Sequence, residues 1–496
     1  MKTEQFFVWL FFGEYGIIWI NKNHLFFMKK IKVLVILFLI MSLTGCSFGG
    51  GSSVKAKKVE LEVWGVFDAE GAYQEIIDAY QISRPNIKVV YKKFRWQEYE
   101  KELVNAWAEG RGPDVFLIHN DWVRKYENKI YPFPGELEIP ILRVERGKAF
   151  QKDKVVTEVK KTSYSLNNLK KDFVNAVYQD VIYQDQIWGL PLAVDTLGLY
   201  YNRKMLDGAG VLEPPRTWQG IIDATKSITR QDSEGNIILS AIAMGTSDNI
   251  QRSSDILSLI MMQNDTTMVN SDGQVSMSEK RSSDKTYYPG VDALRFYTDF
   301  SSPLKETYTW SEDMPEAVDA FIQGKVAMIF DYAFRFPFLK AQAPSLDIGI
   351  STIPHINFLN NQGVDFSDVP NTNVADYWLM TTAKVSENPD EAWDFIVYAT
   401  TSKYKDVDGK VRYQAGKYID STRKPPALRG LIGEYMKDEE MEPFVSHAAT
   451  AENWYHGRDP EHAKEVLREA IDKVYEGELT TKDAIKYAEK NIESTY

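Results

Sequence analysis

The sequence predicts an α/β protein of two lobes, the first of which begins as a doubly wound sheet. The chain has 496 residues, more than one hydrophobic core usually organises, so two lobes are expected. Strand-like alternation at 59–64 and 87–91 is interleaved with helical spacing at 73–80 and 98–108. A third strand is expected at 115–118, where a short apolar run follows a Gly-Pro turn. This order of strands and helices is typical of a doubly wound fold.

The expected strands end in polar and aromatic side chains. A short run that is apolar throughout is typical of a parallel strand buried on both faces, and ligands bind past the carboxyl ends of such strands. A strand expected at 325–330 repeats the pattern of a strand followed by an acid and aromatics. The residues at the ends of these three strands are Trp64 and Asp68, then His119, Asn120, Asp121 and Trp122, and finally Asp331, Tyr332 and Phe334.

Asp195 lies between two extended segments. Pro191 disfavours a helix before it, so residues 187–194 are expected to be extended, while 195–202 alternates as a strand. An acid at such a junction suits a crossing of the chain between two lobes.

Composition narrows the possible functions. The net charge of -12 and the pI near 5.2 argue against nucleic-acid binding, which leaves a footprint of clustered Lys and Arg. The acidic residues are spread along the chain and are expected to form a solvated surface. With one cysteine and six scattered histidines, no metal site, disulfide or cofactor is predicted. The sequence contains neither a Gly-x-Ser-x-Gly nor a His-Glu-x-x-His motif.

An export signal is predicted at residues 28–45. Met28-Lys29-Lys30-Ile31-Lys32 is a basic start, and an apolar run at 33–41 follows it. Residues 1–27 have no basic start, so Met28 is interpreted as the true beginning and 1–27 as an extension; the alternative is an extra segment that enters the membrane.

The signal ends in Leu43-Thr44-Gly45-Cys46, and Cys46 is the cysteine of the chain. This tetrapeptide resembles the lipobox of bacterial lipoproteins, in which the cysteine is lipidated and becomes the first residue of the mature protein. Residues 46–58, rich in Gly, Ser and Lys, are expected to be a flexible tether. The resemblance implies a protein anchored by lipid on the extracytoplasmic face of the cell membrane.

Five further motifs occur in order along the mature chain. They are Gly-Pro-Asp-Val-Phe at 112–116, Trp-Gly-Leu-Pro-Leu-Ala-Val-Asp at 188–195, Leu-Tyr-Tyr-Asn-Arg-Lys-Met-Leu at 199–206, Ala-Phe-Ile-Gln-Gly-Lys-Val-Ala-Met at 320–328 and Trp-Tyr at 454–455. Together they resemble the family 1 extracellular solute-binding proteins of ABC importers, the group that contains maltose-binding protein.

The resemblance implies the fold in more detail. It is a two-lobe, type II periplasmic-binding-protein-like fold, in which each lobe is a mostly parallel sheet flanked by helices and two or three crossings form a hinge. The expected division is lobe 1 at 59–195, lobe 2 at 196–354, a return to lobe 1 at 355–410 and C-terminal helices of lobe 2 at 411–496.

The resemblance also implies a cleft that binds a carbohydrate, expected to be an oligosaccharide, for transfer to ABC permease subunits by a monomeric binding protein. Aromatic rings stack on sugar rings, and carboxylates bind the hydroxyl groups. Trp378 and Trp454 match the family's cleft aromatics, and Phe334 stands where relatives often carry tryptophan. The predicted ligand-binding residues are Trp64, Asp68, Asp121, Trp122, Asp195, Asp331, Tyr332, Phe334, Trp378 and Trp454.

Two alternatives remain open at this stage. A polyamine or another non-sugar solute would also suit an acidic, aromatic cleft, and a secreted glycoside hydrolase would need only two acids such as Asp121 and Asp331. The remaining tryptophans are assigned to the core, namely Trp96, Trp107, Trp188, Trp218, Trp310 and Trp393.

Overall fold

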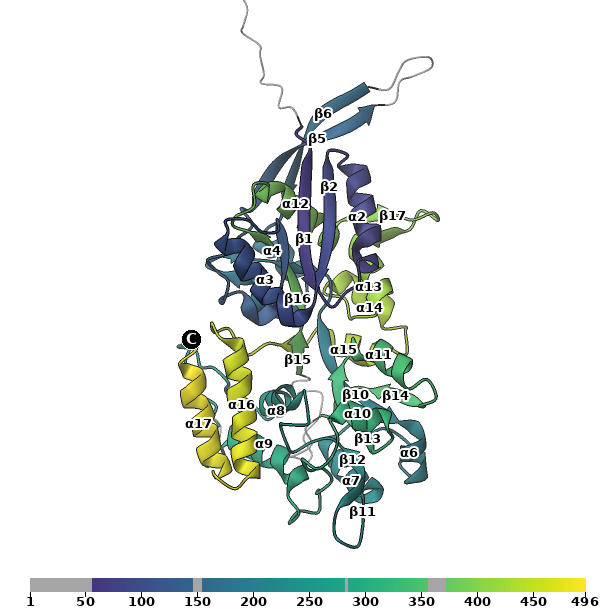
Figure 1. Ribbon diagram of the computed structural model, residues 1–496, viewed down its shortest axis with the longest axis vertical. Coiled ribbons are helices and arrows are strands. Elements are labelled where there is room, and N and C mark those ends of the chain that lie inside the picture. The colour runs from purple at the N-terminus through teal and green to yellow at the C-terminus, as the bar shows by residue number, and fades with distance from the viewer. Residues whose placement is uncertain (1–55, 146–153, 282–283, 356–371) are drawn as a thin grey trace, which may run out of the picture. The chain divides into compact units, whose positions relative to one another are not determined.

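Two β-sheets, each with its own hydrophobic core, organise the chain (Figure 1). The computed structural model describes residues 56–145, 154–281, 284–355 and 372–496. The residues from Ala56 onward form one unit. The expected extension at 1–27, the signal at 28–45 and Cys46 lie outside the described residues.

The first sheet has the strand order β2-β1-β3-β16-β4, with β9 paired to β16. β1 is parallel to β2 and β3, whereas β16 is antiparallel to β3, β4 and β9. The central strand β3 is apolar because it is enclosed, and its residues Val115–Ile118 are at most 2% exposed. The strands are β1 (Val59–Val66), β2 (Ile87–Phe94), β3 (Val115–His119), β4 (Ile130–Tyr131), β9 (Leu190–Pro191) and β16 (Trp378–Ala383).

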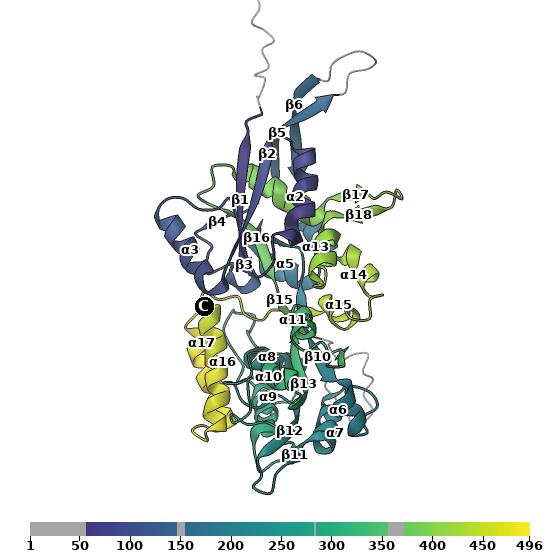
Figure 2. The ribbon, with the colours of Figure 1, turned by 45° about the vertical axis from the view of Figure 1, so that its right-hand side comes forward.

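Helices and small hairpins complete the first lobe (Figure 2). The helices are α2 (Gly71–Ser83), α3 (Trp96–Ala108), the 3₁₀ turn η1 (Asn120–Trp122), α4 (Leu166–Asp172), α5 (Asn175–Val181), α12 (Pro389–Thr401), α13 (Gln414–Thr422) and α14 (Arg429–Tyr435). The hairpins pair β5 (Glu136–Glu145) with β6 (Lys154–Ser163), β7 (Ile182–Tyr183) with β8 (Gln186–Ile187) and β17 (Lys403–Lys405) with β18 (Val411–Tyr413).

The second sheet has the order β11-β12-β13-β10-β15-β19, with β14 paired to β10. Its strands are β10 (Asp195–Asn202), β11 (Arg230–Gln231), β12 (Ile237–Ile242), β13 (Val326–Tyr332), β14 (Ile348–Ser351), β15 (Asn373–Asp376) and β19 (Ala451–Glu452). Its helices are α6 (Arg203–Gly208), α7 (Trp218–Ile228), α8 (Ser253–Gln263), α9 (Pro289–Thr298), the 3₁₀ turn η2 (Asp299–Ser301), α10 (Ala317–Ile322), α11 (Arg335–Gln342), α15 (Glu442–Ala448), α16 (Pro460–Tyr475) and α17 (Thr481–Glu493).

The structure corrects two details of the expected fold. Neither sheet is mostly parallel: in the second, β10 is antiparallel to β13, β14 and β15. Strands that cross between the lobes enter the sheets from the opposite direction, which the local sequence pattern does not reveal. In addition, α13 and α14 contribute Tyr418, Ile419 and Leu431 to the first core, although residues 411–496 were expected in the second lobe.

The described chain passes between the two cores at three places. Val194 belongs to the first core and Leu197 to the second, and β15 in the second sheet leads into β16 in the first. The third passage runs through α15, where Gly198 lets β10 approach closely, since a Cβ there would lie 2.4 Å from the ring of Phe444. The side chain of Asn373 clamps β10 by bonding both the N–H and the carbonyl of Leu197, at 3.2 and 2.8 Å.

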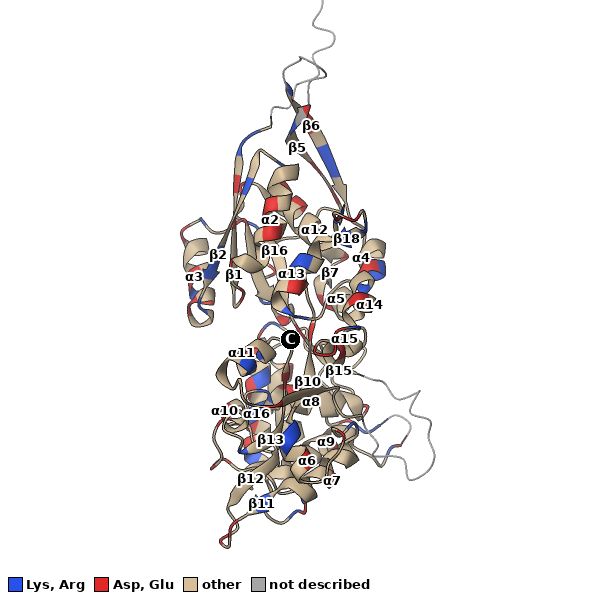
Figure 3. Cartoon of the chain, turned by 90° about the vertical axis from the view of Figure 1, so that its right-hand side faces the viewer, with Lys and Arg blue, Asp and Glu red and all other residues tan. Residues whose placement is uncertain are grey.

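Charged residues of both signs are interspersed over both lobes in the view of Figure 3. Within the described residues, no helix combines the length and apolar character needed to cross a bilayer.

Candidate functional site

The first lobe presents an aromatic cluster at the carboxyl ends of β1 and β3. Trp378 opens β16 opposite His119 of β3, and its ring centroid lies 5.6 Å from that of Phe67 and 5.5 Å from those of Trp96 and Trp122. Phe67 and Trp96 stack on each other at 5.6 Å and are 54% and 41% exposed, whereas Trp122 is buried behind them. We call Phe67, Trp96 and Trp378 the aromatic platform.

Phe67 is held outward by its backbone. Its φ of 62° lies in the left-handed region, which is strained for a residue with a bulky side chain. Strain of this kind persists where the surrounding structure enforces it, and it clusters at functional sites. Here the surroundings include a hydrogen bond from Lys93 to the carbonyl oxygen of Phe67.

The second lobe presents the end of β13. Asp331 is 2% exposed at its side chain and accepts hydrogen bonds from Nε of Arg252 at 3.1 Å and from Nε of Arg335 at 2.7 Å. The Arg252 guanidinium lies 5.0 Å from the Tyr332 ring and 5.3 Å from the Phe334 ring. Two cations and two aromatic rings are therefore grouped around one buried acid.

Asp195 fixes the position of this strand end. Its carboxylate accepts the backbone N–H groups of Ala333 and Phe334, at 2.9 and 3.0 Å, and that of Thr196. Burial raises the pKa of Asp195 to about 7, although the backbone donors act in the opposite direction. Both carboxylate oxygens are thus used inside the protein.

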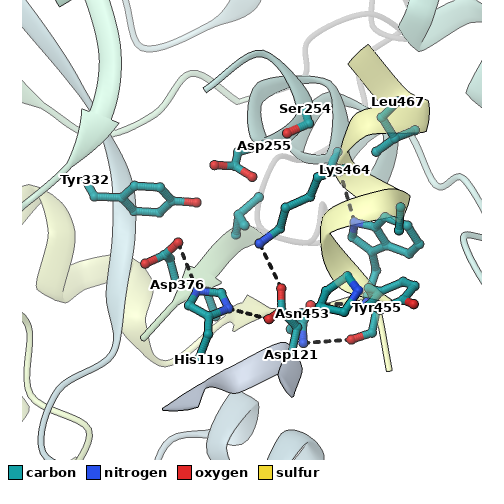
Figure 4. A pocket seen from close by; sticks show the side chains of 16 residues that line it. His119, Asp121, Ser254, Asp255, Tyr332, Asp376, Asn453, Tyr455, Lys464 and Leu467 are labelled. Carbon is teal, nitrogen blue, oxygen red and sulfur yellow. Dashed lines mark hydrogen bonds and ion pairs between the residues drawn. The ribbon is translucent and has the colours of Figure 1, made fainter. Parts of the chain in front are cut away.

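A small pocket with a cavity volume of about 30 Å³ lies where the two lobes meet (Figure 4). It lies between β3 of the first lobe and α8 and α16 of the second. Its lining residues are His119, Asp121, Ser254, Asp255, Ser258, Tyr332, Val374, Ala375, Asp376, Asn453, Trp454, Tyr455, Pro460, Ala463, Lys464 and Leu467.

His119 is held between two acids at the floor of this pocket. Its Nδ1 lies 2.5 Å from Asp121 and its Nε2 lies 3.3 Å from Asp376. Burial alone would lower the pKa of His119, but the two carboxylates outweigh burial and the nearby Lys464, and raise it to about 9. The pKa of Asp376 is lowered in return, because His119 outweighs the opposing effect of burial. His119 also contacts Trp378 at 5.7 Å, so the pocket adjoins the aromatic platform.

Four ion pairs join α16 and the segment before it to the first lobe. Lys464 binds Asp121 at 2.8 Å, Glu461 binds Lys125 at 3.1 Å, Arg458 binds Glu127 at 3.0 Å and His456 binds Asp180 at 2.9 Å. We call this set the α16 ladder. Asp180 is fully buried and also accepts hydrogen bonds from Asn120 and Tyr377.

Comparison with known proteins places this architecture in a family. The model of the bacterial extracellular solute-binding proteins matches residues 67–406, which is more than half of the chain. The chain belongs to this family. The match covers the aromatic platform, the end of β13 and the first two passages between the lobes, and this family consists of solute-binding proteins rather than enzymes.

Two relatives from the solute-binding family show how far their sequences have diverged from this one. A binding protein of Brucella abortus is 21% identical over 306 residues, which are 61% of this chain and 64% of the relative. The maltotriose-binding protein of Pyrococcus abyssi is 21% identical over 333 residues, which are 66% of this chain and 59% of the relative. The chain therefore spans less than two thirds of the length of either relative.

Solved structures share the fold. The cyclic alpha-maltosyl-1,6-maltose binding protein of Arthrobacter globiformis superposes with a TM-score of 0.65 at 15% identity, covering 88% of this chain and 98% of that one. A solute-binding protein of Thermotoga lettingae bound with α-D-tagatose gives a TM-score of 0.61 at 18% identity, covering 88% and 99%. The expected two-lobe α/β architecture of type II binding proteins is confirmed.

The structure brings some of the predicted site residues together. Asp121, Tyr332 and Trp454 line the pocket, and the indole of Trp454 donates to Ser258 at 3.1 Å. Trp378 belongs to the aromatic platform, and Phe334, 36% exposed, lies beside the two arginines.

Other predicted residues lie away from the pocket lining. Trp64 is 4% exposed and packs in the first core, where its indole donates to Glu62. Asp68 binds Lys424 and Tyr418 inside the first lobe, both at 2.6 Å. Trp122, Asp195 and Asp331 are buried and hold neighbouring groups in place.

Several residues of the site were not expected from the sequence. Trp96 was assigned to the core, but it begins α3 and is 41% exposed, whereas Trp107, Trp188, Trp218, Trp310 and Trp393 are buried as expected. Phe67 follows β1 directly and could have been found by extending that strand by two residues. Arg252 directly precedes α8 and Lys464 lies on α16. Neither carries a local mark of function, and only the tertiary fold brings them to the site.

Proposed function

We propose that this protein is an extracytoplasmic solute-binding lipoprotein that captures an oligosaccharide between its lobes and delivers it to an ABC importer. The observation that carries the proposal is an exposed aromatic platform next to a pocket of paired charges. Aromatic faces stack on the apolar faces of sugar rings, and charged groups make strong hydrogen bonds to hydroxyls.

The comparisons support a carbohydrate. One relative is by name a maltotriose-binding protein, and several proteins of similar fold were solved with sugars. The three passages between the lobes are what a hinge needs, and closure of the lobes would remove the solute from water.

We assign two sets of residues to this function. The proposed ligand contacts are Phe67, Trp96, His119, Asp121, Tyr332, Phe334, Trp378 and Trp454. The proposed supporting residues, which position these contacts, are Trp64, Asp68, Trp122, Asp195 and Asp331.

The test is a ligand screen on the purified protein. Oligosaccharides and polyamines are tested by thermal shift, and each positive ligand is titrated by calorimetry. We expect an oligosaccharide to raise the thermal midpoint and to be recovered uncut by chromatography, with an affinity that changes little with salt. A response to polyamines alone, weakened by salt, would favour the alternative solute. Cleavage of the sugar would favour a hydrolase.

The lipid anchor is a separate part of the proposal. The basic start at Met28, the apolar run and Leu43-Thr44-Gly45-Cys46 support lipidation of Cys46, and residues 46–58 would tether the folded chain. Cells expressing the protein are labelled with radioactive palmitate. We expect label in the wild type and none in Cys46→Ser, with the variant released from the membrane fraction. Equal labelling of the two proteins would refute the anchor.

A further inference from the structure

Arg252 and Arg335 form a pair of guanidinium groups that share one acid. Each donates its Nε to a different oxygen of Asp331, and the two arginine side chains are 17% and 16% exposed. Because one carboxylate binds two cations, the group of three carries one net positive charge. The shared acid fixes both guanidinium planes before any ligand arrives.

Most of the donors on these two groups are unused. A guanidinium has five N–H donors. Within the described residues, the side chain of Arg252 makes a hydrogen bond only through Nε, and its Nη1 lies 3.9 Å from Asp255, beyond hydrogen-bond distance. Arg335 uses one terminal nitrogen on the exposed side chain of Gln251, at 2.9 Å. The terminal nitrogens therefore leave room for a ligand acceptor.

The neighbouring pocket adds a tyrosine hydroxyl. Tyr332 is 0% exposed, and its hydroxyl interacts with the carboxylate of Asp255. Figure 4 shows this hydroxyl pointing into the pocket.

The acids of the site, by contrast, are mostly engaged. Asp121 binds His119 and Lys464, and Asp376 binds His119. Asp255 lies 3.9 Å from Nη1 of Arg252 and interacts with the Tyr332 hydroxyl; burial raises its pKa, although Lys464 and Arg252 act in the opposite direction. The site thus offers more donors than acceptors.

We propose that the solute carries a carboxylate, as in an oligosaccharide containing uronic acid, and that Arg252 and Arg335 bind this carboxylate beside the Phe334 ring. The planar fork of a guanidinium matches the two oxygens of a carboxylate. Phe334 lies 5.3 and 5.6 Å from the two guanidinium carbons, so its ring is placed to contact the sugar that bears the acid. This inference rests on the proposed function and specifies its ligand class.

The experiment compares each acidic ligand with its uncharged methyl ester. Trisaccharides of galacturonate, glucuronate and mannuronate are titrated by calorimetry against the purified protein, each beside its methyl ester, with maltotriose as a neutral reference. We expect at least one acid to bind about tenfold or more tighter than its ester, since hydrogen bonds to a charged acceptor are stronger than those to a neutral one.

Variants locate the preference on the two arginines. In Arg252→Gln and Arg335→Gln we expect the acid to lose about tenfold in affinity while the ester keeps its affinity. Arg335→Lys should keep part of the preference, because the charge remains. The matched control is Arg203→Gln, which removes an exposed arginine of the second lobe paired with Asp347 and should leave the preference unchanged.

Each contrary result has a defined meaning. If maltotriose or the esters bind as tightly as every acid, or if the glutamine variants keep the preference, the carboxylate assignment is wrong while the proposed function stands. Tighter binding of a sulfated trisaccharide than of any uronate would overturn the choice of carboxylate over sulfate. If no sugar of either kind binds, the proposed function fails together with this inference.

Discussion

The charge of His119 should make the stability of the protein depend on pH. This side chain is 11% exposed and lies between the carboxylates of Asp121 and Asp376, with Lys464 as the opposing cation nearby. We therefore choose His119→Gln, which keeps a polar side chain of similar length but cannot be protonated. The variant removes the cation that the two acids stabilise.

The size of the effect on the free energy of unfolding follows from the raised pKa of His119. Raising the pKa from 6.5 to about 9 corresponds to about 3 kcal/mol of added stability for the folded state that carries the protonated ring. Because the folded-state pKa is the higher one, this contribution is fully present below about pH 6.5. It is lost as the pH rises from about 6.5 to about 9.

Urea unfolding followed by circular dichroism at a series of pH values between 6 and 9.5 measures the effect. The free energy of unfolding of the wild type should exceed that of His119→Gln at pH 6, and the difference should shrink by about 3 kcal/mol by pH 9.5. His462→Gln is the matched control, because His462 is exposed on the surface of α16. Its curve should run parallel to that of the wild type.

A constant difference between wild type and His119→Gln over this pH range would refute the reasoning. It would mean that the imidazole is neutral in the folded protein and that His119 stabilises the site by packing alone. A difference that grows with pH would be equally incompatible with a raised pKa.

Three further outcomes are expected. Asp180→Ala should lower the free energy of unfolding by about 3–5 kcal/mol in urea titrations, because it strips a fully buried acid from three donors, whereas the exposed Asp223→Ala should change little. Lys464→Met should have a smaller effect, about 1–2 kcal/mol by the same method, since Lys464 is 42% exposed and Asp121 keeps His119. Phe67→Ala should lower the affinity for the solute about tenfold in calorimetry with little loss of stability, while Trp122→Ala, which empties a core position, should lower the thermal midpoint markedly.

Sequence reasoning located the edge of the site better than its individual residues. The carboxyl ends of β1 and β3 do meet, because parallel neighbours end at the same edge, and this brought Asp121 into the prediction. The first strand was expected to end at residue 64, two residues before the observed end of β1. Because of that error, Trp64, which packs in the core, was predicted as a site residue in place of Phe67, which lies at the end of the strand.

Helical residues were harder to place. A tryptophan on a helix is usually buried, and this expectation holds for Trp107 and Trp393. It fails for Trp96, because the first residue of a helix projects beyond the face that packs on the sheet. Lys464 reaches Asp121 across more than 300 residues of sequence, and no local pattern encodes such a meeting.

The α16 ladder has a consequence for how the lobes can come together. The charges on α16 and the segment before it alternate in sign, as Lys464, Glu461 and Arg458. Their partners in the first lobe carry the opposite charges, as Asp121, Lys125 and Glu127. If α16 were shifted along the first lobe by one ion pair, Lys464 would face Lys125, and the two like charges would repel each other. The alternating charges therefore favour a single relative position of the two lobes when they dock. Reversing the charge of one residue of an ion pair should weaken the docking of the lobes, and reversing the charge of its partner as well should restore it.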